Sequence, residues 1–481
     1  MQADAPLHDA APAAIAALFA AQQPTALAWR TSTAGERIAR LRALRGALLA
    51  RRQALSAAFA ADFGKPALEV ELTELLPVVD EIATAIAQLP RWMRPRKVAS
   101  TLLTLGMRAR IAFQPKGRCL IVGPWNYPVA TVLGPLVSAL AAGNTAIVKP
   151  SEFTPHVNAV LQALLEEAFA RSEVALVQGA AATAQALLEC PFDHVFFTGS
   201  AAVGRQVMAA AARQLTPVTL ELGGKSPVIV DRSADLRRAA EVIVWAKLVN
   251  AGQTCIAPDT LFVHRDVRER LLQHCRELLA QRYGDSAQAV AASPDLARMI
   301  HGRHAARLAG LIDEARAGGA HVLAGGDYDL ARRFVAPTLL AQVPAHARIA
   351  QEEIFGPVLP VYEFEQIDDL IAQLDAAPKP LALYLWSRDR ALTEQVLSRT
   401  SSGSAVVNHC LQQFVHTGLP FGGIGGSGFG TAHGVHGFRT FSHERALLHG
   451  GRLLTAKAFF PPYTPLQQRL AAGLSGWLAR K

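Results

Sequence analysis

Residues His194–Arg205 read His-Val-Phe-Phe-Thr-Gly-Ser-Ala-Ala-Val-Gly-Arg, and their pattern changes in the middle. The first part, His194–Phe197, is of strand-forming type, and an alanine-rich run of helical type begins after Ser200. Gly199 permits a tight turn between the two. A strand that passes directly into a helix is one step of a parallel α/β sheet, so this stretch predicts that fold class.

Short β-like runs recur on both sides of this stretch. They occupy residues 119–123, 145–148, 174–177, 194–197 and 218–221, and each of the first four precedes a longer helical run. Strands that alternate with helices predict a parallel, doubly wound sheet. Residues 222 to about 410 repeat the alternation, which predicts a second α/β domain.

The regions outside these two domains follow other patterns. Thr33 and Glu36 form a capping box that predicts the start of a long helix, and a second helical stretch runs from about Ala67 to Met93. Residues 98–114 have no helical face and predict an extended arm. Near the C-terminus a final amphipathic helix is predicted, with an apolar face made of Leu466, Leu470, Leu474, Trp477 and Leu478.

The composition is that of a folded protein with more than one domain. At 481 residues the chain is too long for a single core, and 51% hydrophobic against 18% charged residues excludes a disordered chain. The formal net charge of +9 has two interpretations: solvated, arginine-rich helix faces, or affinity for nucleic acid or a membrane surface. Because no nucleic-acid-binding motif is present, we predict no nucleic-acid partner.

The cysteines and the apolar runs predict a cytoplasmic location. Five cysteines are present, an odd number with no pair close enough for a CxxC motif, so we predict neither disulfides nor a metal site. The apolar run at 10–21 lacks the basic flank of a signal peptide, and the run at 131–142 is too short to cross a bilayer. We therefore predict a cytoplasmic protein without a transmembrane segment.

One thiol and one carboxylate stand in glycine-containing loops. Cys255 follows Gly-Gln-Thr, and Glu221 opens the string Glu-Leu-Gly-Gly-Lys. A thiol that forms a covalent intermediate and a carboxylate that activates water are the parts of covalent catalysis. Asn126, in the string Trp-Asn-Tyr-Pro after a predicted strand, can donate a hydrogen bond to an oxyanion. Taken singly, Cys255 can equally be an inert buried thiol, and Asn126 a turn residue.

Three further strings suit a nucleotide cofactor. Lys149 and Glu152 follow a strand end and can hold ribose hydroxyls, or they can form an ordinary surface ion pair. Gly199 and Ser200 precede a helix N-terminus that can bind a pyrophosphate, or they form an ordinary strand-to-helix turn. The string Glu-Glu-Ile-Phe-Gly-Pro-Val at 352–358 can also be a helix end with a Gly-Pro turn.

Together these strings resemble the signatures of the NAD(P)-dependent aldehyde dehydrogenase superfamily. They occur in the order that the superfamily requires, and Glu221 and Cys255 have its spacing of 34 residues. The string Leu-Pro-Phe-Gly-Gly-Ile-Gly-Gly-Ser-Gly at 419–428 matches its late signature. Finer strings are similar to those of class 3 aldehyde dehydrogenases and bacterial coniferyl aldehyde dehydrogenases, at Trp92–Pro95, Leu215–Val218, Gly252–Asp259, Phe441–His443 and Phe460–Leu466.

The resemblance implies three structural units. A Rossmann-like NAD(P)-binding domain with a parallel sheet is expected from residues 1–97 and 117–221, and an α/β catalytic domain from residues 222–421. A β-rich oligomerisation arm with a C-terminal tail is expected from residues 98–116 and 422–481. The resemblance also implies a homodimer.

The resemblance assigns roles to particular residues. Cys255 is implied as the nucleophile, Glu221 as the base that activates water, and Asn126 as an oxyanion donor. The implied cofactor-binding residues are Trp125, Lys149, Glu152, Gly199, Ser200, Gly204, Leu222, Glu353 and Phe355, and the implied substrate-pocket residues are Tyr127, Trp245 and Thr254.

The implied activity is oxidation of an aldehyde to its carboxylic acid through a thiohemiacetal and a thioester on Cys255. The implied substrate is an apolar aromatic, coniferyl-type aldehyde or a medium- to long-chain aliphatic one. NAD is the implied cofactor because the Glu152 carboxylate would repel the 2′-phosphate of NADP, although class 3 relatives often accept NADP. Two alternatives remain: a CoA-acylating semialdehyde dehydrogenase, whose relatives lack the glutamate found here at 221, and a non-catalytic structural relative.

Overall fold

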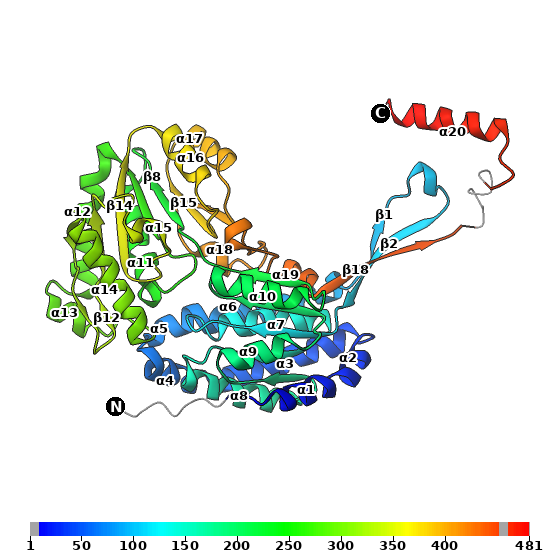
Figure 1. Cartoon of the computed structure of the whole chain (residues 1–481), viewed down its shortest axis with the longest axis horizontal. Coiled ribbons are helices and arrows are strands. Elements are labelled where there is room, and N and C mark those ends of the chain that lie inside the picture. The colour runs from blue at the N-terminus through cyan, green and yellow to red at the C-terminus, as the bar shows by residue number, and fades with distance from the viewer. Residues whose placement is uncertain (1–8, 452–459, 481) are drawn as a thin grey trace.

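The computed structural model describes residues 9–451 and 460–480 (Figure 1). Its first sheet has six strands in the order β17-β7-β6-β3-β4-β5. β17 (Gly428–Phe429) pairs antiparallel with the edge strand β7. The other five strands are parallel to one another: β3 (Arg118–Val122), β4 (Thr145–Lys149), β5 (Val174–Leu176), β6 (His194–Thr198) and β7 (Val218–Glu221). The strands lie where the alternating pattern predicts them, which confirms the α/β fold class.

Helices cover both faces of this sheet. Successive residues of β3 point in opposite directions, so Cys119 and Ile121 join one hydrophobic core and Leu120 and Val122 the other. The larger core is closed by α3 (Ala34–Ala50), α4 (Arg52–Phe63), α6 (Leu76–Trp92), α7 (Ala130–Ala142) and α8 (Pro155–Ala168). The smaller core is closed by α1 (Pro12–Ala21), α9 (Ala181–Leu188) and α10 (Ala201–Ala212), and α2 (Gln23–Trp29) follows α1.

The second sheet has seven strands in the order β10-β13-β14-β9-β8-β15-β16, and it is parallel except for the edge strand β10. Its strands are β8 (Pro227–Val230), β9 (Thr260–His264), β10 (His321–Ala324), β13 (Thr338–Ala341), β14 (Val358–Phe364), β15 (Ala382–Trp386) and β16 (Ser404–Val407), beside the small pair β11 (Tyr328–Asp329) and β12 (Phe334–Val335). Its helices are α11 (Leu236–Leu248), α12 (Arg268–Tyr283), α13 (Ala287–Ala292), α14 (Gly302–Ala317), α15 (Arg348–Gln351), α16 (Ile367–Ala376), α17 (Arg390–Arg399) and α18 (Gln412–Val415).

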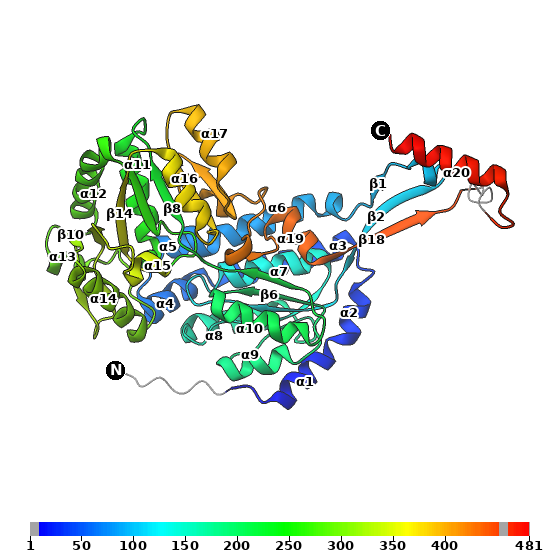
Figure 2. The same ribbon diagram turned by 45° about the horizontal axis from the view of Figure 1, so that its top comes forward.

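A three-stranded antiparallel arm projects from the two α/β units (Figure 2). It consists of β1 (Arg96–Val98), β2 (Arg108–Pro115) and β18 (Ser442–His449), and β2 is the middle strand. The predicted extended segment 98–114 therefore contributes to the arm, with a short 3₁₀ turn at Leu102–Thr104. The predicted C-terminal amphipathic helix is α20 (Pro465–Leu478), which lies beyond the arm.

Two details differ from the sequence pattern. The helical stretch from Ala67 to Met93 is not a uniform α-helix, because a π-helical turn at Glu71–Leu75 separates α5 (Ala67–Val70) from α6. The segment 422–481 also divides: β17 joins the first sheet and α19 (Gly434–Thr440) packs on α6 and α7 before the chain reaches the arm at β18. These long-range contacts place residues 428–440 with the first unit.

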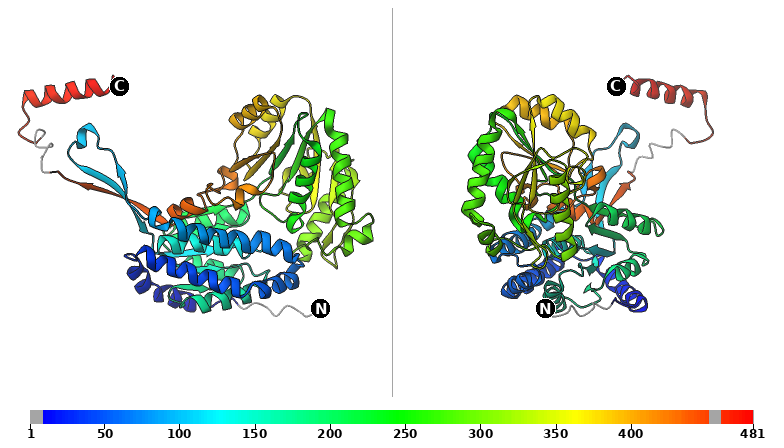
Figure 3. Two further views of the ribbon diagram at one scale, coloured as in Figure 1. Left: turned by 180° about the vertical axis from the view of Figure 1, so that it is seen from behind. Right: turned by 60° about the vertical axis from the view of Figure 1, so that its left-hand side comes forward.

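The parallel strands of the first sheet end at one edge, and from the end of β7 the chain passes into the second unit at β8. The second unit lies against the first on the side away from the arm (Figure 3). In a doubly wound sheet this carboxyl edge is where ligands bind. The loops after β3, β4, β6 and β7 contain Asn126, Glu152, Ser200 and Leu222. The fold thus gathers most of the predicted site residues from distant parts of the chain.

Neither a membrane span nor a metal cluster is found in the described parts of the chain. Within residues 9–451 and 460–480, every helix is too short or too polar to cross a bilayer. Over the same residues, no three His, Cys, Asp or Glu side chains gather in an arrangement that could hold a metal ion.

Candidate active site

The loop before Cys255 has an unusual backbone. Asn250, Ala251 and Gly252 all have positive φ angles, of 55°, 52° and 74°. A Cβ atom on Gly252 would lie 2.3 Å from the carbonyl oxygen of Gly356, so only glycine fits there. Non-glycine residues in the left-handed region cost about 1–3 kcal/mol each and cluster at functional sites. The chain therefore turns sharply just before the thiol.

Gln253 fixes this loop from within the core. Its fully buried side chain donates from Nε2 to the carbonyl oxygens of Asn250 at 3.0 Å and of Arg298 at 3.1 Å. Its Oε1 accepts from the backbone N–H of Ile300 at 3.0 Å. A buried amide with three hydrogen bonds holds its backbone firmly, so the position of Cys255 is well defined.

Asn126 connects the first unit to the loop that contains Cys255. Its buried Nδ2 donates to the carbonyl oxygen of Gln253 at 3.0 Å, two residues before Cys255. In return, Asn250 Nδ2 donates to the carbonyl oxygen of Asn126 at 2.8 Å. The paired bonds hold Asn126, in the loop after β3, against the loop that contains Cys255.

The neighbouring residues make a second connection. The hydroxyl groups of Tyr127 and Thr254 lie 2.6 Å apart in a hydrogen bond. Burial raises the pKa of Tyr127 well above its ordinary value, so its hydroxyl stays protonated. Thr254 directly precedes Cys255, and this bond therefore holds the Cys255 loop against the first unit.

The Cys255 thiol is protonated in this environment. Burial raises its pKa to about 12, and the carboxylates of Glu353 and Glu221 add to the effect. Hydrogen bonds from the backbone N–H groups of Cys255 and Ile256 act in the opposite direction. A thiolate is the nucleophilic form of cysteine, so reaction at Cys255 requires a group that removes this proton.

Glu221 is the free carboxyl group beside this thiol. It ends β7 and is almost completely buried. In the part of the chain that the structure describes, neither carboxyl oxygen has a hydrogen-bond partner. Burial raises its pKa well above the ordinary value for glutamate. A buried carboxyl that makes no structural hydrogen bond is suited to exchange a proton with a reacting molecule.

The cofactor side of the site lies along the ends of β4 and β6. Lys149 is buried at the end of β4, and its Nζ lies 3.3 Å from Glu152 Oε2. Ser200 caps α10, with its Oγ accepting from the backbone N–H of Val203 at 3.4 Å. The N-terminus of a helix favours negative charge, so α10 presents an anion-binding end at this edge.

Close packing surrounds this helix end. A Cβ atom on Gly199 would lie 2.6 Å from Phe197 Cζ, and one on Gly204 would lie 2.8 Å from Leu222 Cδ2. Leu222 itself is buried in the smaller core of the first sheet. The predicted residues Gly199, Gly204 and Leu222 thus bring α10 against the ends of β6 and β7.

Glu353 lies against the backbone of the loop after β7. A Cβ atom on Gly223 would lie 2.3 Å from Glu353 Oε1, so the carboxyl group occupies the space that a side chain would fill. Burial raises the pKa of Glu353 to about 7, and a hydrogen bond from the backbone N–H of Gly224 partly opposes this. The predicted ribose-binding carboxylate is therefore held beside Glu221 and Cys255, whose thiol responds to both charges.

The half-buried Lys225 and the buried Asp259 fix the segment that contains Glu353. Lys225 Nζ donates to the carbonyl oxygens of Ile349 at 3.0 Å and Glu352 at 3.1 Å, and it pairs with Asp259. Asp259 Oδ2 accepts from the backbone N–H of Ile354 at 2.8 Å. This arrangement explains why a lysine follows the Glu-Leu-Gly-Gly string.

Phe355 faces Trp125 across the site. Their ring centroids lie 5.4 Å apart in an edge-to-face arrangement. Phe355 has a positive φ of 52°, and its carbonyl oxygen accepts a 2.8 Å hydrogen bond from His304 Nε2. The predicted cofactor-side residues Trp125 and Phe355 are therefore in direct contact.

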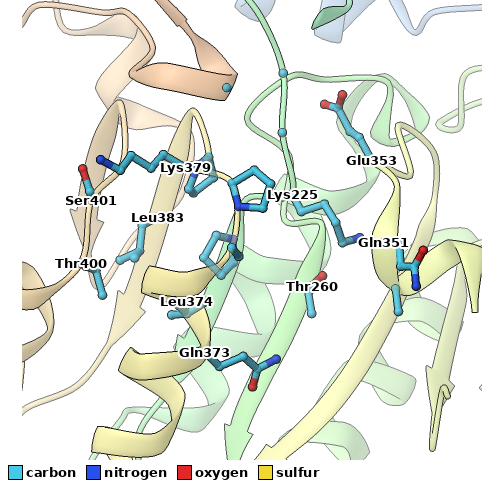
Figure 4. Close-up of a pocket in the computed structure, with 18 of the residues that line it drawn as sticks. Lys225, Thr260, Gln351, Glu353, Gln373, Leu374, Lys379, Leu383, Thr400 and Ser401 are labelled. Atoms are coloured by element: carbon cyan, nitrogen blue, oxygen red, sulfur yellow. The ribbon is translucent and has the colours of Figure 1, made fainter. Parts of the chain in front are cut away.

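A cleft of about 610 Å³ opens beside Glu353 (Figure 4). Glu353 and Gln351 stand on one side of it, and Lys379, Thr400 and Ser401 on the other. Its walls also include residues of α10 and of the loop after β7, namely Ala201, Arg205, Gly223, Gly224 and Lys225. The cleft thus connects the helix N-terminus at Ser200 with the Glu353 carboxyl.

Trp245 lies in a separate hollow on another side of the second unit. This hollow of about 430 Å³ is lined by Trp245 together with Tyr283, His409 and Gln412. His409 and Gln412 follow β16 in the chain. The structure therefore groups Trp245 with the segment after β16, whereas Tyr127 bonds to Thr254, next to Cys255.

The sequence model of the aldehyde dehydrogenase family matches residues 3–447 of the chain. The chain belongs to the aldehyde dehydrogenase family. Its relatives include the 4,4′-diaponeurosporen-aldehyde dehydrogenase of Staphylococcus aureus, which is 40% identical over 402 residues, 84% of this chain and 86% of that protein. Aldehyde dehydrogenase family 3 member A2 of Mus musculus is 41% identical over 415 residues, 86% of this chain and 84% of that protein.

Solved structures of aldehyde dehydrogenases have the same fold. The substrate-bound state of Staphylococcus aureus AldH superposes with a TM-score of 0.90 at 37% identity, covering 96% of this chain and 99% of that one. PnpE in complex with nicotinamide adenine dinucleotide gives a TM-score of 0.84 at 27% identity, covering 94% of this chain and 95% of that one. These similarities confirm the predicted family and the predicted likeness to class 3 members. They also confirm the prediction that the chain is an NAD(P)-dependent oxidoreductase.

Some residues of this aldehyde dehydrogenase site were not predicted. Lys65 and Glu74 form a fully buried pair, and Lys65 Nζ lies over the Tyr127 ring. No role was predicted for either residue. One signal was available: Glu74 stands four residues from both Val70 and Val78, on the apolar face of a predicted helix. A carboxylate on a buried face calls for a partner, since isolated buried charges are very costly.

Proposed function

We propose that this aldehyde dehydrogenase oxidises an apolar aromatic, coniferyl-type aldehyde or a medium- to long-chain aliphatic aldehyde to its carboxylic acid. The observation that supports this most is the 3.0 Å hydrogen bond from Asn126 to Gln253, which brings an amide donor to the loop of the partly buried Cys255 thiol. Cys255 is the nucleophile, Asn126 the oxyanion donor and Glu221 the general base.

The first half of the reaction forms a carbon–sulfur bond. Cys255 Sγ attacks the aldehyde carbon as its proton passes to a carboxylate. The carboxylates whose charges act on this thiol are those of Glu353 and Glu221. Asn126 Nδ2 and the backbone N–H of Cys255 donate to the oxygen that becomes negative, which lowers the energy of the transition state. A bound nicotinamide would supply the hydride acceptor, and loss of hydride from this carbon leaves a thioester on Cys255.

The second half breaks the carbon–sulfur bond with water. Glu221 removes a proton from a water molecule whose oxygen attacks the thioester carbon, and the Cys255 sulfur leaves as the acid forms. Because neither oxygen of Glu221 is engaged elsewhere among the described residues, its carboxyl group is available for this transfer.

The residues along the cleft fit a dinucleotide. Lys149 and Glu152 would hold the adenine-side ribose, and Ser200 with the N-terminus of α10 would hold the pyrophosphate. Glu353 would hold the nicotinamide ribose, since its carboxyl group already lies against the exposed backbone of Gly223. The NAD complex of PnpE supports this choice of cofactor.

The substrate class rests on apolar and aromatic surroundings. Tyr127 and Thr254 stand beside the thiol, and Trp245 lines the hollow with Tyr283 and His409. The name of the Staphylococcus aureus relative, a diaponeurosporen-aldehyde dehydrogenase, supports an apolar aldehyde. The homodimer and the cytoplasmic location stay predictions of the sequence.

The test is a panel of aromatic and aliphatic aldehydes assayed with NAD and with NADP at 340 nm. We expect reduction of the cofactor without added CoA, with free carboxylic acid as the product. Dependence on CoA with release of an acyl-CoA would support the CoA-acylating alternative. A protein that reduces neither cofactor with any aldehyde would be a non-catalytic relative.

Replacing Asn126 with alanine should lower kcat by roughly 100-fold or more, the usual loss for one oxyanion donor. The fold should be retained, because Asn126 belongs to a loop, and circular dichroism would check this. Steady-state kinetics at saturating aldehyde and cofactor give the measurement. An unchanged kcat would make Asn126 a turn residue only.

Replacing Glu152 with glutamine should shift cofactor preference towards NADP. The carboxylate that would repel the 2′-phosphate becomes neutral, so the ratio of kcat/KM for NADP to that for NAD should rise roughly tenfold. Glu394→Gln on α17 is the matched control, because among the described residues Glu394 pairs only with Arg390, on an exposed helix face. The same ratio in Glu152→Gln and wild type would remove Glu152 from cofactor selection.

A further inference from the structure

A buried ion pair lies beside Tyr127, next to the active site. Lys65 Nζ is 2.7 Å from Glu74 Oε1, and neither side chain has any exposed surface. Taking two charges out of water is expensive, and apolar residues of the same size often give a protein that is equally stable or more stable. The pair therefore needs an explanation other than stability.

Glu74 determines where helix α7 begins. Its second oxygen, Oε2, accepts from the backbone N–H groups of Val129 at 3.1 Å and Ala130 at 2.9 Å, at the N-terminus of α7. A carboxylate suits this place because the helix dipole is positive there. Asn126 and Tyr127 lie in the loop just before this helix. Glu74 thus fixes the end of the loop that supplies the oxyanion donor.

Lys65 supports the same loop through Tyr127. Its Nζ lies 4.1 Å from the centre of the Tyr127 ring, within the range of a cation–π interaction. The hydroxyl of the same ring bonds to Thr254 at 2.6 Å, next to Cys255. A continuous series of contacts therefore runs from the ion pair to the nucleophile loop.

Glu69 reaches the nucleophile loop from the other side. Its Oε2 accepts from the backbone N–H of Asn250 at 2.8 Å, at the first left-handed residue of the turn before Cys255. That N–H would otherwise be hard to satisfy in so distorted a backbone. Glu69 thus supports the turn, and Glu74 supports the opposing loop.

The π-helical turn lets both carboxylates serve one site. In a regular α-helix, side chains five residues apart point about 140° away from each other. The turn at Glu71–Leu75 is wider, with hydrogen bonds between residues five apart, so Glu69 and Glu74 come closer to one face. Such turns are frequent at functional sites.

We propose that Lys65, Glu69 and Glu74 are positioning residues for aldehyde oxidation. They touch neither substrate nor cofactor; they hold Asn126, Thr254 and the turn before Cys255 in the relative placement that the chemistry needs. This inference rests on the proposed function. An error of about 1 Å in such placement costs roughly 100-fold in rate.

The main test removes the ion pair while filling its space. Lys65→Met or Glu74→Met alone would leave an unpaired buried charge, so the double variant Lys65→Met/Glu74→Met is used. We expect a folded protein with a lower Tm, because the N–H groups of Val129 and Ala130 lose their acceptor. We also expect a kcat lower by roughly 10- to 100-fold and an unchanged KM for NAD. Lys65→Met/Glu74→Gln, which keeps an oxygen acceptor for α7, should recover part of the lost kcat.

Glu69 gives an independent pair of variants. Glu69→Gln keeps an oxygen that can accept from Asn250, so its kcat should stay within about threefold of wild type. Glu69→Leu loses the acceptor, and its kcat should fall roughly tenfold or more. If the double variant fails to fold, this pair decides: equal kcat values for Glu69→Leu and Glu69→Gln would overturn the proposal.

Asp231→Asn controls for a general loss of stability. Asp231 is also a buried carboxylate, and its Oδ2 accepts from Ser233 N at 3.0 Å and Ser233 Oγ at 2.6 Å, at the end of β8. This variant should lower Tm and leave kcat within about twofold. A kcat loss in Asp231→Asn as large as that in Lys65→Met/Glu74→Met would overturn the proposal. A wild-type kcat in Lys65→Met/Glu74→Met would also overturn it.

A crystal structure of Lys65→Met/Glu74→Met separates this inference from the proposed function. We expect Asn126 Nδ2 to lie beyond hydrogen-bond distance of the Gln253 carbonyl oxygen. Retention of that 3.0 Å bond would overturn the inference even if no aldehyde were ever oxidised. Conversely, a wild-type protein without aldehyde dehydrogenase activity would overturn the proposed function alone.

Discussion

Replacing Cys255 with alanine should abolish aldehyde oxidation while leaving NAD binding largely intact. Cys255 is the only cysteine whose loop also contacts Asn126 in the part of the chain that the structure describes, through Gln253. Without its sulfur no covalent intermediate can form, and the remaining groups cannot expel hydride from a free aldehyde. Reduction of NAD at 340 nm measures the activity, and equilibrium dialysis measures cofactor binding.

Cys190→Ala is the matched control, because Cys190 is the other cysteine that is only partly buried. Its activity should equal that of wild type. Substantial dehydrogenase activity in Cys255→Ala would refute the nucleophile assignment.

Replacing Glu221 with glutamine should separate the two halves of the reaction. Hydride transfer needs the cysteine sulfur, whereas hydrolysis of the thioester needs a base for water. Rapid mixing with aldehyde and NAD should therefore give a burst of about one NADH per active site, followed by very slow turnover. Glu221 can also help to deprotonate Cys255, and in that case the burst would disappear as well.

The pH dependence gives a second measurement of the same role. Burial raises the pKa of Glu221, so the basic carboxylate form accumulates only as the pH rises. While hydrolysis limits the rate, kcat of the wild type should rise with pH below that pKa, with a slope of about 1 in log kcat. Glu221→Gln should lose this rise. Normal steady-state turnover in the variant would show that Glu221 is not the base.

The fold was predictable because buried parallel strands are short, nearly continuous apolar runs. Cys119–Gly123 and His194–Phe197 stand out against the helical pattern around them, and both became central strands. The pairing of β17 with β7 was not predictable in this way. It joins Gly428 to Glu221 across some two hundred residues, and two-residue strands leave no periodic signal.

The candidate site was predictable as far as short strings specify chemistry. Cys255, Glu221 and Asn126 stand in loops of recognisable pattern, and the structure brings their loops together; their roles stay predictions. Glu69 was missed because the sequence does not reveal the π-helical turn at Glu71–Leu75. Lys65 was missed because it lies in the short non-helical stretch before α5, where no periodic pattern predicts burial. A regular helical pattern assigns Glu69 to a different face from Glu74.

The most direct measurement of the central claim is the intact mass of Glu221→Gln after rapid mixing with aldehyde and NAD. We predict a covalent acyl adduct, one per chain, which peptide mapping assigns to Cys255, and the adduct should appear together with the burst of NADH. NADH formation with an unmodified protein, or an adduct on another residue, would contradict the covalent mechanism. Absence of both burst and adduct would place the role of Glu221 before hydride transfer and contradict its assignment to hydrolysis.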